Sequence, residues 1–269
     1  MTHIALVVSD VDGTLLTKDK ILTDKAARAV RQLEDSGVGF TVVSSRPTIG
    51  MKFLVDPLRI TLPFGSFNGS SITDPQLNPI EQHALPASTA QRSLEILKQF
   101  GVDIWLFTND KWFAGNPDGE YNPLEKRTIK IDPVIVDDFT PYLAAACKIV
   151  GSSSDPALLQ RCQAAMQQAV GAQATVACSQ TYYLDVTPPG YDKGTFVEAM
   201  VKRLGIAADA VATIGDMHND LAMFKKSGMS IAMGNATDEI KRQATNVTTS
   251  NQDEGFAGAI EMVMKQNGA

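Results

Sequence analysis

The stretch Ile4-Ala5-Leu6-Val7-Val8-Ser9-Asp10-Val11-Asp12-Gly13-Thr14-Leu15 decides how this chain is expected to fold. Its first part, Ile4 to Val8, is a continuous apolar run of strand length, which is typical of a strand buried on both faces of a sheet. Asp10 and Asp12 follow directly. In extended backbone, residues two apart project to the same side, so the two carboxylates can share one site. Gly13 permits a tight exit from the strand. Because ligands bind at the carboxyl ends of strands in an open α/β sheet, we predict a functional site here. A calcium-like acidic loop and two solvated aspartates in a turn are the alternatives.

A second apolar run ends in the same way. Val211 to Ile214 is followed by Gly215-Asp216-Met217-His218-Asn219-Asp220, which places Asp216 at the strand end and Asp220 one helical turn later if a helix has begun. Carboxylates from adjacent strand ends, together with a backbone carbonyl and waters, make a hard oxygen site of the magnesium type. The alternative is a helix N-terminus that simply favours acidic residues.

Two further segments carry groups that suit a phosphate. Ser44-Ser45-Arg46 follows the predicted strand Phe40 to Val43, and a serine hydroxyl with nearby backbone amides can donate to phosphate oxygens. Lys193-Gly194-Thr195 opens a predicted helix, where a compact ammonium is a good point charge for a phosphate or for a carboxylate that binds metal. Either signal alone is weak, since loop serines and lysines at helix starts are usually solvated.

The chain as a whole alternates strand-like and helix-like patterns at its two ends. Such alternation with short connections indicates a parallel sheet with helices on both faces. Between about His83 and Pro188 the prolines, aromatic residues and half-buried strands are denser. We therefore predict an α/β fold: a Rossmann-like doubly wound parallel sheet core made of residues 1–82 and 189–269, with an inserted α+β domain at 83–188. Expected elements include helices at 48–55, 89–100, 194–204 and 219–226, strands at 103–108, 148–151, 175–178 and 182–187, a helix start at Asp155-Pro156, and a tight turn at Asn68-Gly69.

Composition limits the possible partners. Of the 269 residues 44% are hydrophobic and 20% charged, with a formal net charge of -6, which argues weakly against a nucleic-acid partner. The sequence contains no apolar run of the roughly 20 residues that a membrane span needs, so no membrane partner is expected. The three cysteines show no CxxC spacing and are predicted to be buried free thiols in a cytoplasmic protein. The oligomeric state is not predicted.

The four polar segments, in this order and at these strand ends, resemble the haloacid dehalogenase superfamily. The long insertion between the second and third segments is similar to the cap of the Cof-type branch. The resemblance implies a Mg²⁺-dependent phosphatase that acts through an aspartyl-phosphate intermediate on a small phosphorylated metabolite, with a sugar phosphate preferred to a cofactor-type phosphate. The cap is then expected to determine which substrate binds.

The family pattern also implies a role for each residue that matches it. It makes Asp10 the nucleophile and Asp12 the general acid and base. It implies phosphate or substrate binding by Ser44, Ser45, Arg46, Lys193 and Asn219. It implies metal binding by Asp10, by Asp216 and by the backbone carbonyl of Asp12, with Asp220 as a carboxylate close to the metal.

One segment departs from the branch, and other functions stay open. Ser44-Ser45-Arg46 stands where Thr-Gly-Arg is common, so Ser45 places a side chain where backbone usually approaches the ligand. Arg46 either reaches the substrate or braces the loop by pairing with an acidic group. A phosphomutase would use the same paired aspartates, and a catalytically silent binding or regulatory module could share the fold. A pump-type ATPase is disfavoured because Val11-Asp12 replaces the lysine and threonine of that motif and no membrane span is present.

Overall fold

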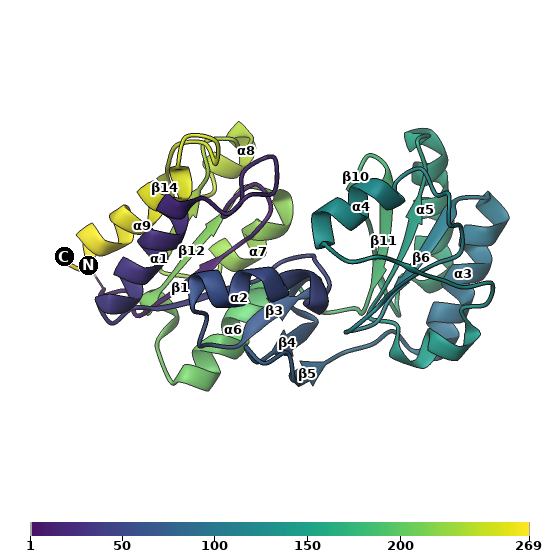
Figure 1. Cartoon of the computed structure of the whole chain (residues 1–269), viewed down its shortest axis with the longest axis horizontal. Helices are drawn as coiled ribbons and strands as arrows, with labels where there is room; N and C mark the ends of the chain where they lie inside the picture. Colours follow the sequence, from purple (N-terminus) through teal and green to yellow (C-terminus); the bar gives the residue numbers. More distant parts are fainter. Residues whose placement is uncertain (1, 269) are drawn as a thin grey trace. The chain divides into compact units, whose positions relative to one another are not determined.

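The structure, a computed structural model, describes residues 2–268 and divides into two units (Figure 1). Within the described residues the first unit comprises 2–45, Lys52–Ile80 and 191–268, and the second comprises Arg46–Met51 and Glu81–Gly190. The main divisions thus fall at 80/81 and 190/191. The short segment Arg46–Met51 groups with the second unit, which was not predicted.

The first unit is built on a five-stranded parallel sheet with the order β14-β13-β12-β1-β2. Its strands are β1 (Leu6–Ser9), β2 (Gly39–Val42), β12 (Val211–Gly215), β13 (Met229–Ala232) and β14 (Asn246–Val247). The central strand β1 has neighbours on both sides, and its four residues are all buried. A continuous apolar run is therefore the sequence of a strand covered on both faces.

Helices cover both faces of this sheet. They are α1 (Asp24–Asp35), α2 (Lys52–Leu58), α6 (Lys193–Leu204), α7 (Leu221–Phe224), α8 (Asp238–Lys241) and α9 (Gly255–Gln266). Leu6 and Val8 of β1 pack in one cluster with Phe196 of α6. Phe40 of β2 meets Phe256 of α9 edge to face at 6.0 Å between ring centroids. The prediction of a doubly wound α/β core is confirmed.

Two smaller features complete the first unit. Strands β3 (Phe64–Ser66), β4 (Ser71–Thr73) and β5 (Pro79–Gln82) form a separate sheet in that order, and the division at 80/81 falls within β5. A bridge between Val43 and Gly65 ties β3 to the end of β2. The 3-10 turns are η2 (Phe67–Gly69), η4 (Ala208–Ala210) and η5 (His218–Asp220).

The second unit is an α+β domain, as predicted for this insertion. Its six-stranded sheet has the order β10-β11-β9-β6-β7-β8, antiparallel except for β7 with β8. The strands are β6 (Asp103–Phe107), β7 (Trp112–Ala114), β8 (Val134–Ile135), β9 (Lys148–Ser152), β10 (Thr175–Gln180) and β11 (Tyr183–Thr187). The helices are α3 (Ala87–Phe100), α4 (Asn122–Ile129) and α5 (Pro156–Val170), with 3-10 turns η1 (Thr48–Met51) and η3 (Thr140–Ala145). Leu97 of α3, Ile149 of β9 and Met166 of α5 share one apolar core.

Local sequence explains where several helices begin. The Asp155 carboxylate accepts hydrogen bonds from the backbone N–H groups of Ala157 and Leu158, and Pro156 occupies the first turn of α5, as predicted. Asp192 caps α6 in a reciprocal capping box with Thr195. Lys193 is thereby fixed as the first residue of that helix.

Some sequence predictions need correction. The helix expected at 48–55 is a 3-10 turn followed by α2, which begins at Lys52. The helix expected at 219–226 is likewise divided between η5 and the short α7. Strand β7 and helix α4 were not predicted, and Cys178 is exposed rather than buried.

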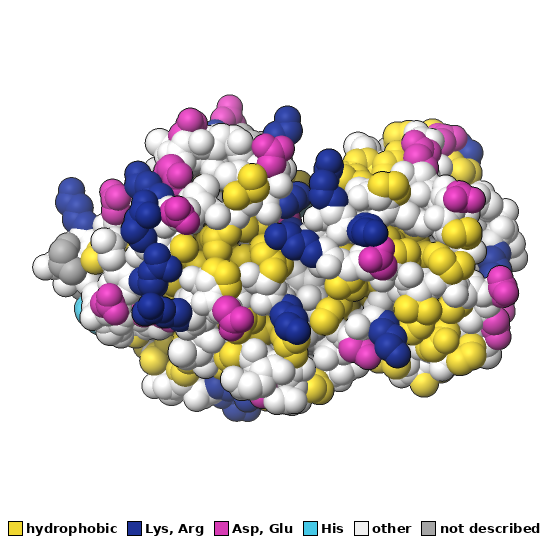
Figure 2. All heavy atoms as spheres, viewed as in Figure 1, with side chains coloured by type: hydrophobic (Ala, Val, Ile, Leu, Met, Phe, Trp, Pro, Cys, Tyr) yellow, Lys and Arg dark blue, Asp and Glu magenta, His cyan; other side chains and the backbone are white. Residues whose placement is uncertain are grey.

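Two further observations concern the charges on the surface and the lengths of the helices. Figure 2 shows basic and acidic side chains interspersed over the surface of each unit in the view drawn, with apolar side chains between them. Among residues 2–268, no helix is both long enough and apolar enough to cross a membrane.

Candidate active site

Asp10 lies at the carboxyl end of β1, the central strand of the parallel sheet. Its backbone N–H donates to the carbonyl of Ile214 on β12 at 2.9 Å, which continues the sheet pairing to the edge of the site. Its side chain is buried, and its Oδ1 accepts a hydrogen bond from Lys193 Nζ at 2.6 Å. The strand therefore places this carboxylate inside the protein, in contact with a cation from α6.

Lys193 joins two carboxylates. Its Nζ also donates to Asp220 Oδ1 at 2.6 Å, and its side chain is only 1% exposed. Burial by itself would lower the pKa of Lys193, but the charges of Asp10 and Asp220 and their hydrogen bonds outweigh this effect and raise the pKa above its usual value. The side chain is therefore a buried ammonium, positioned by the first turn of α6.

Asp220 is held from two sides. Its Oδ2 accepts hydrogen bonds from the backbone N–H groups of Asp216 and Met217, both at 2.8 Å, while its Oδ1 meets Lys193. The absence of a side chain at Gly215 makes room for it, because a Cβ there would lie 2.5 Å from Asp220 Cβ. Both oxygens of Asp220 are thus already engaged within the protein.

Asp216 is oriented by a network of neutral groups. Thr14 Oγ1 donates to Asp216 Oδ1 at 3.1 Å, and Asn235 Nδ2 donates to Asp216 Oδ2 at 3.1 Å. The same Asn235 nitrogen lies 2.9 Å from the carbonyl oxygen of Gly13, to which it also donates. This network ties the end of β12 to the loop that leaves β1.

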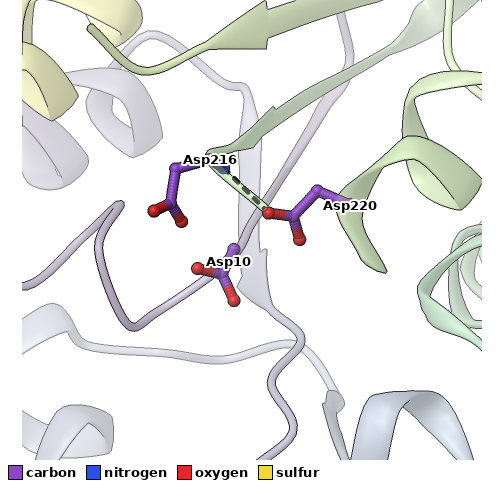
Figure 3. A group of neighbouring side chains, drawn as sticks. All are labelled: Asp10, Asp216 and Asp220. Atoms are coloured by element: carbon purple, nitrogen blue, oxygen red, sulfur yellow. Dashed lines mark hydrogen bonds between the residues drawn. The ribbon is translucent and has the colours of Figure 1, made fainter. Parts of the chain in front are cut away.

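The carboxyl groups of Asp10, Asp216 and Asp220 gather in one place, as Figure 3 shows, and offer ligand atoms that all lie within 4.8 Å of one another. Burial raises the pKa of Asp10 well above its usual range. Lys193 opposes this effect, and the neighbouring carboxylates add to it. Burial, followed by the charge of Asp220, raises the pKa of Asp216 to about 6. Three buried carboxylates and one ammonium leave an excess of negative charge, and hard oxygen ligands suit Mg²⁺. The residues present therefore fit the predicted cofactor.

Asp12 occupies a different position from these three carboxylates. Its side chain is about a quarter exposed (24%) and pairs with Lys20 Nζ at 2.8 Å. Its charge still contributes to the raised pKa of Asp216. The next residue, Gly13, has a φ of +88°, and a Cβ there would lie 2.4 Å from Asp216 Oδ2. The Asp12-Gly13 loop therefore passes directly against the Asp216 carboxylate.

The remaining predicted residues lie at three places. Ser44 is buried beyond the end of β2, and its backbone N–H donates to the carbonyl of Gly65 at 3.0 Å, while Ser45 is half-buried. Asn219 is exposed, and its Nδ2 donates to Asn68 Oδ1 at 3.0 Å. Arg46 belongs to the second unit, where its buried guanidinium donates to the backbone carbonyls of Thr128 at 2.5 Å and Gly50 at 3.3 Å.

Comparison with known proteins identifies the family. A sequence profile described as haloacid dehalogenase-like hydrolase matches residues 7–260. The chain belongs to this family.

Relatives of this haloacid dehalogenase-like hydrolase are named phosphatases. It is 26% identical over 258 residues to the 5-amino-6-(5-phospho-D-ribitylamino)uracil phosphatase of Bacillus subtilis, covering 96% of this chain and 94% of that one. It is 28% identical over 238 residues to HMP-PP phosphatase of Yersinia pestis, covering 88% and 86%. A haloacid dehalogenase-like hydrolase from Bacteroides thetaiotaomicron matches with a TM-score of 0.91 and 26% identity, over 97% of this chain and 99% of that one. The predictions of a Cof-type member of the superfamily and of a phosphatase are confirmed.

Two residues of the site were not predicted. Thr14 lies within the motif that follows β1, and Asn235 follows Gly234 just beyond β13. Asn235 thus comes from a further strand end of the same parallel sheet. That position is a signal that could have identified Asn235, because the carboxyl ends of parallel strands meet at one edge.

Proposed function

We propose that this hydrolase removes phosphate from small phosphorylated metabolites, with sugar phosphates preferred, in a Mg²⁺-dependent reaction. The observation that carries the proposal is the buried contact of Lys193 with both Asp10 and Asp220 beside Asp216. A carboxylate nucleophile, an ammonium and a cluster of hard oxygen ligands are the groups that phosphoryl transfer to a carboxylate requires. The names of the relatives support a small phosphorylated substrate.

The reaction would proceed in two steps. An oxygen of Asp10 attacks phosphorus in line, the bond from phosphorus to the leaving oxygen breaks, and Asp12 gives its proton to that oxygen. Asp12 then takes a proton from water, which attacks phosphorus and releases Asp10 and inorganic phosphate. The partial exposure of Asp12 supports this role, because it must exchange a proton with leaving group and water in turn.

Charge neutralisation would come from Lys193, Ser44 and the metal. When bound, Mg²⁺ would supply positive charge that reduces the repulsion between the Asp10 carboxylate and an anionic substrate. Asp10 and Asp216 would hold it with the backbone carbonyl of Asp12. Asp220, whose two oxygens already accept hydrogen bonds, would add charge and hold Lys193 in place.

The remaining predicted residues receive the following proposed roles. Ser44 would donate to the phosphoryl oxygens, with Ser45 and Asn219 contributing further polar groups. The guanidinium of Arg46 donates to backbone carbonyls of the second unit, which favours the bracing role over substrate binding. The second unit would be the cap that determines substrate choice.

A test compares two aspartate variants with a neighbouring control. With Mg²⁺ present, Asp10→Asn should release no phosphate above background from a panel of phosphorylated metabolites, because the nucleophile is lost. Asp12→Asn should lower kcat by roughly 10²–10⁴-fold for substrates with poor leaving groups. Asp19→Asn, an exposed position in the same loop region, should behave like the parent protein.

The outcomes separate the proposed function from its rivals. Unaltered thermal unfolding of Asp10→Asn would show that its fold is kept. Near-normal turnover by that variant would refute the mechanism. Transfer of the phosphoryl group to another position of a sugar, without release of phosphate, would identify a phosphomutase instead.

A further inference from the structure

The turn η2 has an unusual backbone. Phe67, Asn68 and Gly69 have φ values of +50°, +58° and +96°, so three consecutive residues adopt left-handed conformations and two of them carry side chains. Such conformations cost free energy in non-glycine residues, and they persist only where the surrounding structure holds them in place. Phe67 is buried in the first unit, which anchors the turn.

The backbone of this turn contacts Ser44. The N–H of Asn68 donates to the Ser44 carbonyl at 2.8 Å, while the N–H of Ser44 donates to Gly65 just before the turn at 3.0 Å. Both peptide groups that flank the Ser44 side chain are therefore fixed by the segment Gly65–Asn68. The backbone position from which the Ser44 side chain projects is thus held by this segment.

The same turn lies against the start of the helix that carries Lys193. A Cβ on Gly69 would lie 2.7 Å from the backbone carbonyl oxygen of Asp192, the N-cap of α6. Backbone therefore meets backbone at a distance that only glycine allows. This close approach, together with its φ of +96°, explains why glycine stands at position 69.

The side chain of Asn68 reaches a third segment of the site. Its Oδ1 accepts a hydrogen bond from Asn219 Nδ2 at 3.0 Å, and Asn219 precedes Asp220 in η5. Accepting this bond fixes which way the Asn219 amide faces. One short turn thus contacts the segments that contain Ser44, Lys193 and Asn219.

We propose that Asn68 is a positioning residue of the phosphatase reaction, which holds Ser44 through its backbone and Asn219 through its side chain. Asn68 makes both contacts at once, its N–H meeting the Ser44 carbonyl and its side-chain oxygen meeting Asn219. The inference rests on the proposed phosphatase function. It predicts that the side chain of Asn68 affects catalysis more than it affects folding.

The decisive variant is Asn68→Gly. Glycine adopts the left-handed conformation freely and keeps the N–H that meets Ser44, so only the bond to Asn219 is lost. With p-nitrophenyl phosphate and Mg²⁺, kcat should fall about 3- to 10-fold, the range expected for one lost neutral hydrogen bond. The inhibition constant of inorganic phosphate should rise by a similar factor. The melting temperature should not fall, because a left-handed glycine is unstrained. A purely structural role would instead lower the melting temperature and leave kcat unchanged.

A matched control and a double variant complete the test. Arg59→Gly replaces an exposed residue with a φ of +52°, outside the site, and should leave kcat unchanged. If Asn68 acts through Asn219, adding Asn68→Gly to Asn219→Ala should cause little further loss. A double variant whose loss equals the product of the two single losses would overturn the inference, as would an Asn68→Gly protein with normal kcat and normal inhibition by phosphate.

A failure of the proposed function would be seen separately. If the parent protein hydrolyses no substrate, calorimetric titration with inorganic phosphate in the presence of Mg²⁺ still decides the role of Asn68. Weaker phosphate binding by Asn68→Gly than by Arg59→Gly would support the inference. Equal binding by the two variants would reject it, whatever the activity of the parent protein.

Discussion

Replacing Lys193 by methionine should destabilise the metal-free protein and increase its response to Mg²⁺. Methionine has a similar length but leaves Asp10 and Asp220, each 2.6 Å from Nζ, without their cation. Removing one partner of a buried ion pair costs about 3–5 kcal/mol. The carboxylates can avoid part of this cost by taking up a proton. The free energy of taking up one proton becomes less favourable by about 1.4 kcal/mol for each unit by which the pH rises. The loss should therefore be large at pH 8 and small at pH 5.

The assay is thermal unfolding at both pH values, with and without Mg²⁺. At pH 8 the melting temperature should fall by roughly 2–4 °C for each kcal/mol lost. Mg²⁺ should raise it more in Lys193→Met than in the parent protein, because the competing ammonium is gone. Phosphatase activity should fall about 10²–10³-fold, since a donor to the transferring group is missing.

Lys226→Met is the matched control. Lys226 pairs with Glu198 at the same 2.6 Å, but both side chains are about half exposed, so its removal should change the melting temperature little. If Lys193→Met were as stable as the parent at pH 8 without metal, the assignment of Lys193 as the cation that holds this cluster together would be wrong. A smaller Mg²⁺ response than that of the parent would contradict the competition between Lys193 and the metal.

Two further predictions concern the same site. Gly13→Ala should lower Mg²⁺ affinity in calorimetric titrations, because the added Cβ would press on Asp216 Oδ2. Gly37→Ala is the control, since Gly37 has a similar φ of +86° and an added Cβ would meet nothing within 4 Å. Equal Mg²⁺ affinities in the two variants would contradict the prediction. The second prediction is a pH dependence. The pKa of Asp216 is raised to about 6, so between about pH 4 and 6 the folded metal-free protein holds a proton that the unfolded chain has released. The free energy of unfolding should therefore decrease as the pH rises from about 4 to 6. The rise in melting temperature caused by Mg²⁺ should accordingly grow through this range as proton competition ends, and a rise independent of pH would refute it.

The strand-end motifs made much of the fold predictable. A buried parallel strand must be apolar throughout, so Ile4 to Val8 and Val211 to Ile214 could be recognised from their sequence alone. The paired strands β1 and β12 then bring Asp10 and Asp216 to one edge of the sheet. The inserted domain was recognised because its prolines and aromatic residues interrupt the alternating pattern.

Contacts made by neutral side chains were not predictable in the same way. Asn235 and Asn68 act through hydrogen bonds to groups far away in the sequence, and an asparagine in a loop has no pattern that distinguishes it from a turn residue. The short helix α4 was missed because its buried residues are few and two of them, Asn122 and Glu125, are polar. Asn122 accepts a hydrogen bond from Trp105 Nε1 at 2.9 Å and donates to the carbonyls of Asn116 and Pro117, contacts that leave no pattern in the sequence. Neutral side chains that hydrogen-bond to the site are therefore harder to predict from the sequence than its charged residues.

The segment Arg46–Met51 has a consequence for engineering this protein. Because it groups with the second unit, the chain passes between units at 45/46 and 51/52 as well as at 80/81 and 190/191. Excising the insertion and closing the gap would leave the Arg46 guanidinium without its Thr128 acceptor. Grafting an insertion from a relative should therefore transplant this six-residue segment together with α4, so that the Arg46 guanidinium keeps both backbone carbonyls to which it donates, those of Gly50 and Thr128.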